Sequence, residues 1–263
     1  MNDLSDYLDF IESDFQCTGT SLQDVDRLLA QVCFFNPASD LAEIDKFDVA
    51  VLGVADERGS DNSGTELAPL KIRAYLYGLA HIPGLKIVDL GNVKRGSEFG
   101  DALSVLELVC DRFIDRPITI VIIGGAQLFS YPVFKSFSNR GKKLNFVTVD
   151  PRLDLDGTAP TLSEHNYIGK ILLDSGNSLF NITNIGYQNY LNSERSKKII
   201  DDFLFDVIRL GNAQESIKKL EPVFRDAHIC SVDITSVRQS DAPGNVRPSP
   251  NGFWGNEVCQ MSR

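Results

Sequence analysis

The chain has 263 residues, of which 43% are hydrophobic and 24% charged, a balance typical of a folded globular protein. Its formal net charge of −10 disfavours binding to nucleic acid or to a membrane, because anionic surfaces need a cationic protein face. Five widely spaced cysteines without a CxxC pair, and the lack of a basic secretory signal or bilayer-length apolar run, predict a cytoplasmic protein without disulfides.

Segments with helical spacing alternate with short apolar runs along the chain. Helices are expected at 20–33, 66–79, 99–114, 129–139 and 193–210. Strands are expected at 47–54, 86–91, 118–125, 145–150, 180–187 and 228–234. This order predicts a three-layer α/β/α fold with a mainly parallel sheet. We expect one domain over residues 1–263, with a helical lead-in at about residues 1–45.

Three of the expected strands end in segments that could carry chemistry. They are GGAQL at 124–128, DPRLD at 150–154 and SVDIT at 231–235. Ligands of parallel sheets bind beyond the carboxyl ends of the strands, so Asp150, Asp154 and Asp233 are expected to meet in one crevice. Three clustered carboxylates need a cation among them. It is either a hard divalent ion such as Mn²⁺ or Mg²⁺, or Arg152, whose guanidinium can pair with a carboxylate through two hydrogen bonds.

The same three segments resemble the GGDHS, DAHxD and SxDxD signatures of the ureohydrolase superfamily, which includes arginase, agmatinase and formimidoylglutamase. Further similarity lies in VLGV near residue 51, PLKIR at 69–73, DLGNV at 89–93 and APGNVRPSPNGFWGNE at 242–257. The resemblance covers roughly residues 47–257, is strongest to the formimidoylglutamase-like branch, and implies an arginase-like fold.

The resemblance also implies a two-manganese centre built from two histidines and four aspartates, and this chain departs from that pattern. Gln127 and Arg152 stand where the histidines are expected, and Thr235 stands where the last aspartate is expected. A guanidinium cannot ligate a metal. The retained positions, which form either a vestigial or a single-metal site, are Asp150, Asp154 and Asp233.

None of the three histidines, His81, His165 and His228, occupies a metal position of the motif. Family members place a substrate-side histidine in the region of His165, which makes it a candidate catalytic residue. The alternative interpretation is a loop histidine without a role.

The leading hypothesis is a catalytically inactive pseudoenzyme with a scaffold, ligand-binding or regulatory role and no cofactor. The alternative is a hydrolase of linear amidine C–N bonds that uses a reduced Mn²⁺ site, and a third reading is a degraded gene product without stable function. Only a short segment follows Thr235, so the C-terminal part of the family fold is expected to be missing. By resemblance we also expect a homo-oligomer and a small-molecule ligand.

Overall fold

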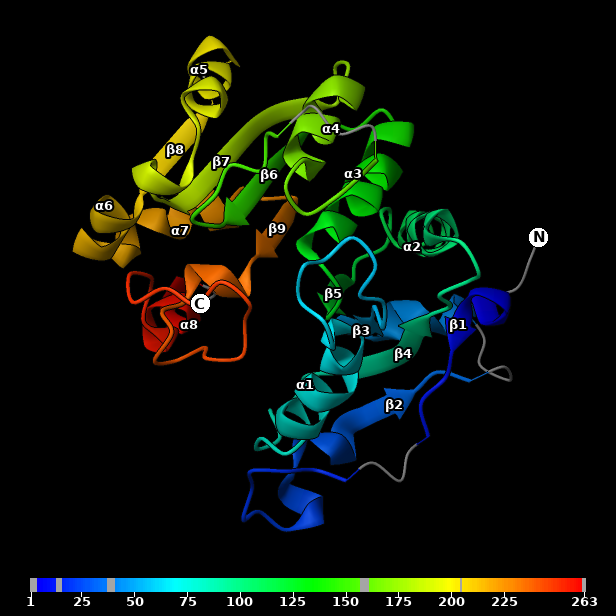
Figure 1. Ribbon diagram of the computed structural model, residues 1–263. Helices are drawn as coiled ribbons and strands as arrows, with labels where there is room; N and C mark the ends of the chain where they lie inside the picture. Colours follow the sequence, from blue (N-terminus) through cyan, green and yellow to red (C-terminus); the bar gives the residue numbers. More distant parts are fainter. Residues whose placement is uncertain (1–3, 13–15, 37–40, 157–160, 204, 262–263) are drawn as a thin grey trace. The chain divides into compact units, whose positions relative to one another are not determined.

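The computed structural model describes residues 4–12, 16–36, 41–156, 161–203 and 205–261 (Figure 1). The chain forms two compact units, Met1–Pro132 and Val133–Arg263, and each contains one hydrogen-bonded sheet. The single domain over residues 1–263 stays a prediction. Among the described residues, the cysteines form no disulfide, and no helix is long and apolar enough to cross a membrane.

The first unit contains a five-stranded sheet with the path β1-β4-β3-β5, and β2 also pairs with β4. Its strands are β1 (Leu8–Asp9), β2 (Val32–Phe34), β3 (Val49–Gly53), β4 (Ile87–Val93) and β5 (Thr119–Ile123). All pairs are parallel except β1 with β4. The longer helices are α1 (Ala68–Leu76), α2 (Phe99–Asp111) and α3 (Ser130–Asn139). The boundary between the two units falls within α3. The 3-10 helices are η1 (Leu4–Tyr7), η2 (Asp24–Asp26), η3 (Leu28–Gln31), η4 (Leu41–Lys46), η5 (Thr65–Leu67) and η6 (Gln127–Phe129).

A buried ion pair fastens α1 to β4 in this unit. The side chains of Arg73 on α1 and Asp89 on β4 are both fully buried and joined by two hydrogen bonds, of 2.7 Å from Nε and 2.9 Å from Nη2. The guanidinium also donates to Asn92 Oδ1 and to the carbonyl of Gly91, both at 2.8 Å. The Tyr77 hydroxyl donates to Asp89 as well. Every charged group is therefore compensated inside the core, as burial requires.

The second unit contains a four-stranded sheet in the order β8-β7-β6-β9, with every pair parallel. Its strands are β6 (Leu144–Val149), β7 (Leu179–Tyr187), β8 (Asp206–Arg209) and β9 (Ile229–Val232). Its helices are α4 (Tyr167–Asp174), α5 (Glu194–Phe203), α6 (Leu210–Glu215), α7 (Glu221–Arg225) and α8 (Gly255–Met261). The 3-10 helices are η7 (Asn189–Leu191), η8 (Ile217–Leu220) and η9 (Ile234–Ser236).

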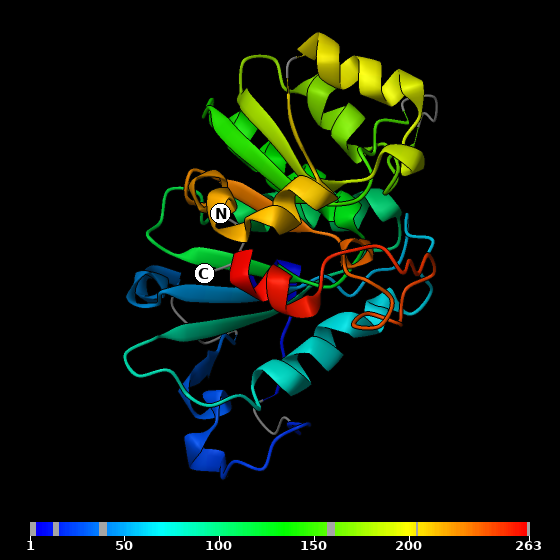
Figure 2. The same ribbon diagram turned by 90° about the vertical axis from the view of Figure 1, so that its left-hand side faces the viewer.

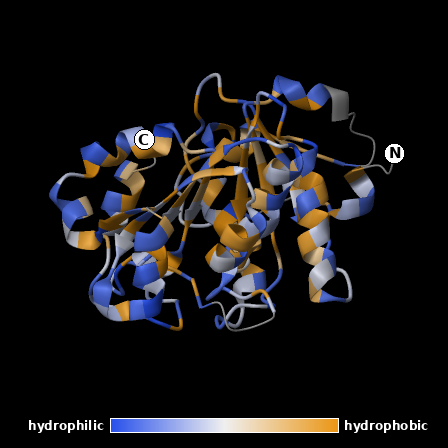
Figure 3. Ribbon diagram, turned by 90° about the horizontal axis from the view of Figure 1, so that it is seen from above, coloured by the Kyte–Doolittle hydropathy of each residue, from blue (hydrophilic) through white to orange (hydrophobic). Residues whose placement is uncertain are grey.

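Helices cover both faces of the second sheet, and Figure 2 shows α4 and α6 on opposite sides of it. Val147, Val149 and Ile185 share a buried cluster with residues of α6 and α8. Because side chains alternate along a strand, Thr148 faces the other way, where its Oγ1 lies 3.4 Å from the hydroxyl of Tyr167 at the start of α4. Apolar residues dominate the strands (Figure 3). The α/β class and the mainly parallel strand pairing predicted from the sequence are confirmed.

Two of the expected helices are wrong. Residues 20–33 form η2 and η3 and then enter β2, because Arg27 between the two turns is extended and forms a β-bridge with Ala80. The expected helix at 193–210 ends at Phe203 as α5, and Asp206–Arg209 forms β8 on the edge of β7. The adjacent β-branched residues Val207 and Ile208 favour this strand, and pairing with β7 overrides the helical spacing.

Replacing Arg73 by Ala leaves the Asp89 carboxylate buried without its counter-charge, so we expect a loss of about 3–5 kcal/mol in the free energy of unfolding. Urea unfolding followed by circular dichroism measures this loss. The matched control is Arg225→Ala, since Arg225 pairs with Glu221 while both side chains are more than half exposed. It should change stability by less than about 1 kcal/mol. Equal losses in the two variants would contradict this role of Arg73.

Candidate functional site

Asp150 and Asp233 lie side by side at the carboxyl edge of the second sheet. Each directly follows its strand, and the last residues of β6 and β9, Val149 and Val232, are paired in register. The Asp150 amide donates to Ile185 O at 2.9 Å, and the Asp233 amide donates to Val149 O at 3.0 Å. The strand pairing thus continues through both aspartates and fixes where their side chains begin.

Both aspartates use one carboxylate oxygen to cap the turn that follows them. Asp150 Oδ1 accepts from the backbone amide of Arg152 at 2.7 Å, and Asp233 Oδ1 accepts from that of Thr235 at 2.6 Å. Such bonds to the amide two residues on are typical of aspartate in tight turns. They orient each carboxylate.

Asp154 brings a third carboxyl group to this edge. Its side chain is buried, and its φ of 46° is the only positive φ of a non-glycine residue in the described parts of the chain. Burial and the charge of Asp233 raise the pKa of Asp154 well above its usual range, and burial with the charges of Asp154 and Asp233 does the same to the pKa of Asp150.

Arg152 lies between these residues in the chain and contributes mainly through its backbone. Its charge lowers the pKa of Asp154, although burial and Asp233 outweigh this effect. Among the described residues, no ion pair within 4.0 Å joins its guanidinium to Asp150, Asp154 or Asp233. The expected two-pronged pairing is therefore not found, because sequence spacing does not determine the direction of a long, half-exposed side chain.

The other two substituted positions fall in different parts of the chain. Thr235 lies in η9, next to Asp233, and its backbone rather than its hydroxyl contacts that carboxylate. Gln127 opens η6 in the first unit. Its expected place beside the aspartates stays a prediction.

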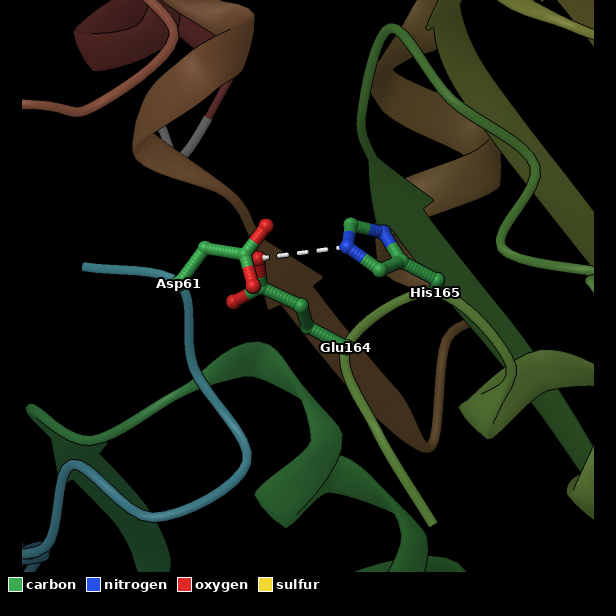
Figure 4. A group of neighbouring side chains, drawn as sticks. All are labelled: Asp61, Glu164 and His165. Atoms are coloured by element: carbon green, nitrogen blue, oxygen red, sulfur yellow. Dashed lines mark ion pairs between the residues drawn. The ribbon is translucent and has the colours of Figure 1, made fainter. Parts of the chain in front are cut away.

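His165 lies close to Glu164, with which it is drawn in Figure 4, and to Arg247. Arg247 Nη2 lies 2.8 Å from His165 Nε2 and 3.2 Å from Glu164 Oε1. The distance between His165 Nε2 and Glu164 Oε1 is 3.8 Å. A guanidinium only donates, so His165 Nε2 must accept and the proton of the neutral ring lies on Nδ1. In this geometry His165 cannot donate a proton through Nε2. Asp61, also drawn in Figure 4, belongs to the first unit.

Tyr167 is fully buried at the start of α4, and its phenol interacts electrostatically with the three aspartates. Burial and the negative charges of Asp154, Asp150 and Asp233 raise the pKa of Tyr167 well above its usual range. The hydroxyl therefore stays protonated and neutral.

The donor set at this edge fits one hard divalent cation. Three carboxyl groups offer oxygen ligands, and a cation would relieve their mutual repulsion. A second cation finds no histidine at position 152, where Arg152 already brings positive charge. Lowering the pKa of a bound water to the neutral range is the chemistry that a bound metal would supply here.

Sequence reasoning missed several side chains of this site. Arg247 lies within APGNVRPSP, which carries the resemblance, but it is 82 residues from His165 and nothing local indicates their contact. The amides of Asn184 and Asn192 contact the segment between Asp150 and Asp154, and polar residues at the end of a buried strand were the available signal.

Comparisons with known proteins identify the family and the fold. Residues 47–263 match the arginase family. Formiminoglutamase from Trypanosoma cruzi, solved with Mn²⁺, is 20% identical with a TM-score of 0.77, over 90% of this chain and 84% of that one. Formimidoylglutamase from Bacillus subtilis is 18% identical with a TM-score of 0.77, over 94% and 83%. A hypothetical agmatinase from Burkholderia thailandensis is 18% identical with a TM-score of 0.65, over 82% and 72%. No curated protein matches.

Replacing Asp154 by Asn should raise the free energy of unfolding of the metal-free protein at pH 7 by about 1–2 kcal/mol, because it removes a buried like charge. Asparagine tolerates the left-handed backbone of this position, so no new strain arises. Urea unfolding in the presence of a chelator measures the change. The control is Asp156→Asn, an exposed position two residues on, which should alter stability by less than about 0.5 kcal/mol. A destabilised Asp154→Asn protein would show that the three carboxylates do not repel one another.

Proposed function

The chain belongs to the arginase family, and from that premise we propose that it is a catalytically inactive member whose carboxylate cluster holds at most one divalent cation. In this proposal it does not hydrolyse amidines. Its remaining role is that of a scaffold, a regulator or a receptor for a small ligand.

One observation carries the proposal: position 152, in the turn between Asp150 and Asp154, holds an arginine where the family pattern has a metal-binding histidine. Arg152 cannot ligate a metal, and its positive charge disfavours a second cation nearby. Thr235 supplies a neutral hydroxyl in place of a carboxylate. Both changes remove ligands from the same half of the expected centre, so a pair of cations lacks the groups to hold it.

The contacts of His165 support the same conclusion. Its Nε2 accepts from Arg247 at 2.8 Å, so this nitrogen is unavailable for proton transfer to a leaving group. The proposed site thus lacks ligands for a second metal, and Arg247 already engages the Nε2 atom of His165.

A second candidate function has one observation in its favour. Asp150, Asp154 and Asp233 interact with one another at one edge of the second sheet, and a single Mn²⁺ would compensate their charge. Formiminoglutamase from Trypanosoma cruzi was solved with Mn²⁺. The alternative is therefore a hydrolase of linear amidine C–N bonds that works with a reduced Mn²⁺ site.

Hydrolysis of formimidoylglutamate, agmatine and arginine in the presence of Mn²⁺ separates the two functions. For each of the three substrates, we expect the rate of product formation to equal the rate without protein. The site lacks the ligands for the pair of cations that would form hydroxide at neutral pH. Release of formamide or urea that depends on Mn²⁺ and is abolished in Asp150→Ala would establish the hydrolase instead. The double substitution Asp156→Asn/Asp174→Asn, at exposed positions, controls for charge.

Restoring the family ligands should restore metal binding. We expect Arg152→His combined with Thr235→Asp and Gln127→His to bind at least tenfold more tightly to Mn²⁺ than the parent chain, an effect of about 1.4 kcal/mol or more. Titration calorimetry measures the affinity. Arg209→His serves as a surface control. Unchanged affinity in the triple variant would mean that the three substitutions are not what limits the site.

A further inference from the structure

The backbone between Asp150 and Asp154 is held by side-chain amides from outside the segment. It makes a tight turn that ends in the left-handed conformation of Asp154, which few non-glycine residues adopt. Such a turn persists only when its surroundings fix it, and here two asparagines from the neighbouring strand and the loop after it make the contacts.

Asn192 contacts this segment at two points. Its Nδ2 donates to Pro151 O at 2.9 Å, and its Oδ1 accepts from the Leu153 amide at 2.8 Å. The same Nδ2 also donates to Gln188 O at 2.8 Å, which fixes the amide to the end of β7. One side chain thus spans the turn and ties it to the neighbouring strand.

Asn184 holds the carbonyl between these two points. It is buried in β7, opposite Thr148 of β6, and its Nδ2 donates to Arg152 O at 2.8 Å. Its Oδ1 is buried without a hydrogen-bond partner among the described residues. A buried amide oxygen without a hydrogen-bond partner lowers the stability of the fold. The hydrogen bond from Asn184 Nδ2 to Arg152 O has to offset this cost.

These contacts fix the turn between the two carboxylates. Without them the carbonyls of Pro151 and Arg152 and the amide of Leu153 would lose these partners, and the turn could relax. We propose that Asn184 and Asn192 are positioning residues that hold the turn of 151–153, so that the Asp150 and Asp154 carboxylates face one site. The proposal rests on the proposed function in one respect, namely that this cluster is the cation site.

Amide hydrogen exchange of the chelator-treated protein tests the proposal. In Asn192→Ala, the Leu153 amide should exchange at least about tenfold faster, while amides of β6 and β7 keep their rates, since the opening is local. Asn192→Asp keeps the oxygen that accepts from Leu153 and should retain most of the protection of that amide. Asn184→Ala should speed exchange of the Arg152 amide to a similar extent.

The matched control is Asn145→Ala. Asn145 lies at the opposite end of β6, its Nδ2 donates to Asp226 O at 3.0 Å, and its Oδ1 is also buried without a partner in the described chain. A general loss of stability would affect all variants alike, whereas positioning predicts faster exchange of 152–153 only in the Asn184 and Asn192 variants. Unchanged exchange there, or equal acceleration in the Asn145 variant, would overturn the proposal.

Titration with Mn²⁺ alone measures the affinity of the site for this ion. Replacing an asparagine that only stabilises the fold would leave this affinity unchanged. The dissociation constant for Mn²⁺ should be about tenfold higher in Asn192→Ala than in the parent chain. In Asn145→Ala it should stay within twofold of the parent value. The exchange measurement needs no metal, so it decides this proposal even where the stoichiometry or a hydrolysis assay contradicts the proposed function.

Discussion

The repulsion among three carboxyl groups at one edge of the second sheet is the constraint on which the rest of the site depends. Parallel pairing of β6 and β9 places Asp150 and Asp233 side by side, and the turn after β6 returns Asp154 to them. In the absence of a cation, burial and the neighbouring negative charges raise the pKa values of Asp150 and Asp154. Backbone amides cap two of the carboxylates, and side-chain amides hold the turn between them. Each of these contacts opposes a separation that electrostatics would otherwise favour.

The position of Arg152 gives this arrangement its functional meaning. A guanidinium in the turn supplies positive charge near Asp154 without offering a lone pair to a metal. In the proposed function, this positive charge disfavours a second cation nearby, and the arginine also takes the place of a histidine that would bind one. Arg247 has a comparable effect on His165, because a donor that is always charged occupies the ring nitrogen. In the proposed function, the two arginines explain how a site can keep the carboxylates of a metal centre and lose the groups that would make it reactive.

The sequence predicted the parts of this structure that depend on local pattern. Apolar runs located β3, β5 and β6, and the residues after β6 and β9 indicated Asp150 and Asp233, because strand ends of a parallel sheet meet at one edge. It failed where distant contacts decide. The segment 193–210 has helical spacing, but pairing with β7 turns Asp206–Arg209 into β8. The direction of the Arg152 side chain and the contact between His165 and Arg247 depend on packing between segments far apart in the chain, which spacing alone does not encode.

The number of Mn²⁺ ions bound per chain tests the central claim most directly. Elemental analysis after equilibration with Mn²⁺ and removal of unbound ion gives this number, and Asp150→Asn/Asp154→Asn/Asp233→Asn corrects it for sites elsewhere on the acidic surface. The account predicts a corrected value of no more than about one, with any bound ion raising the melting temperature as binding linkage requires. A corrected value close to two would contradict it, because Arg152 and Thr235 would then not prevent a dinuclear centre.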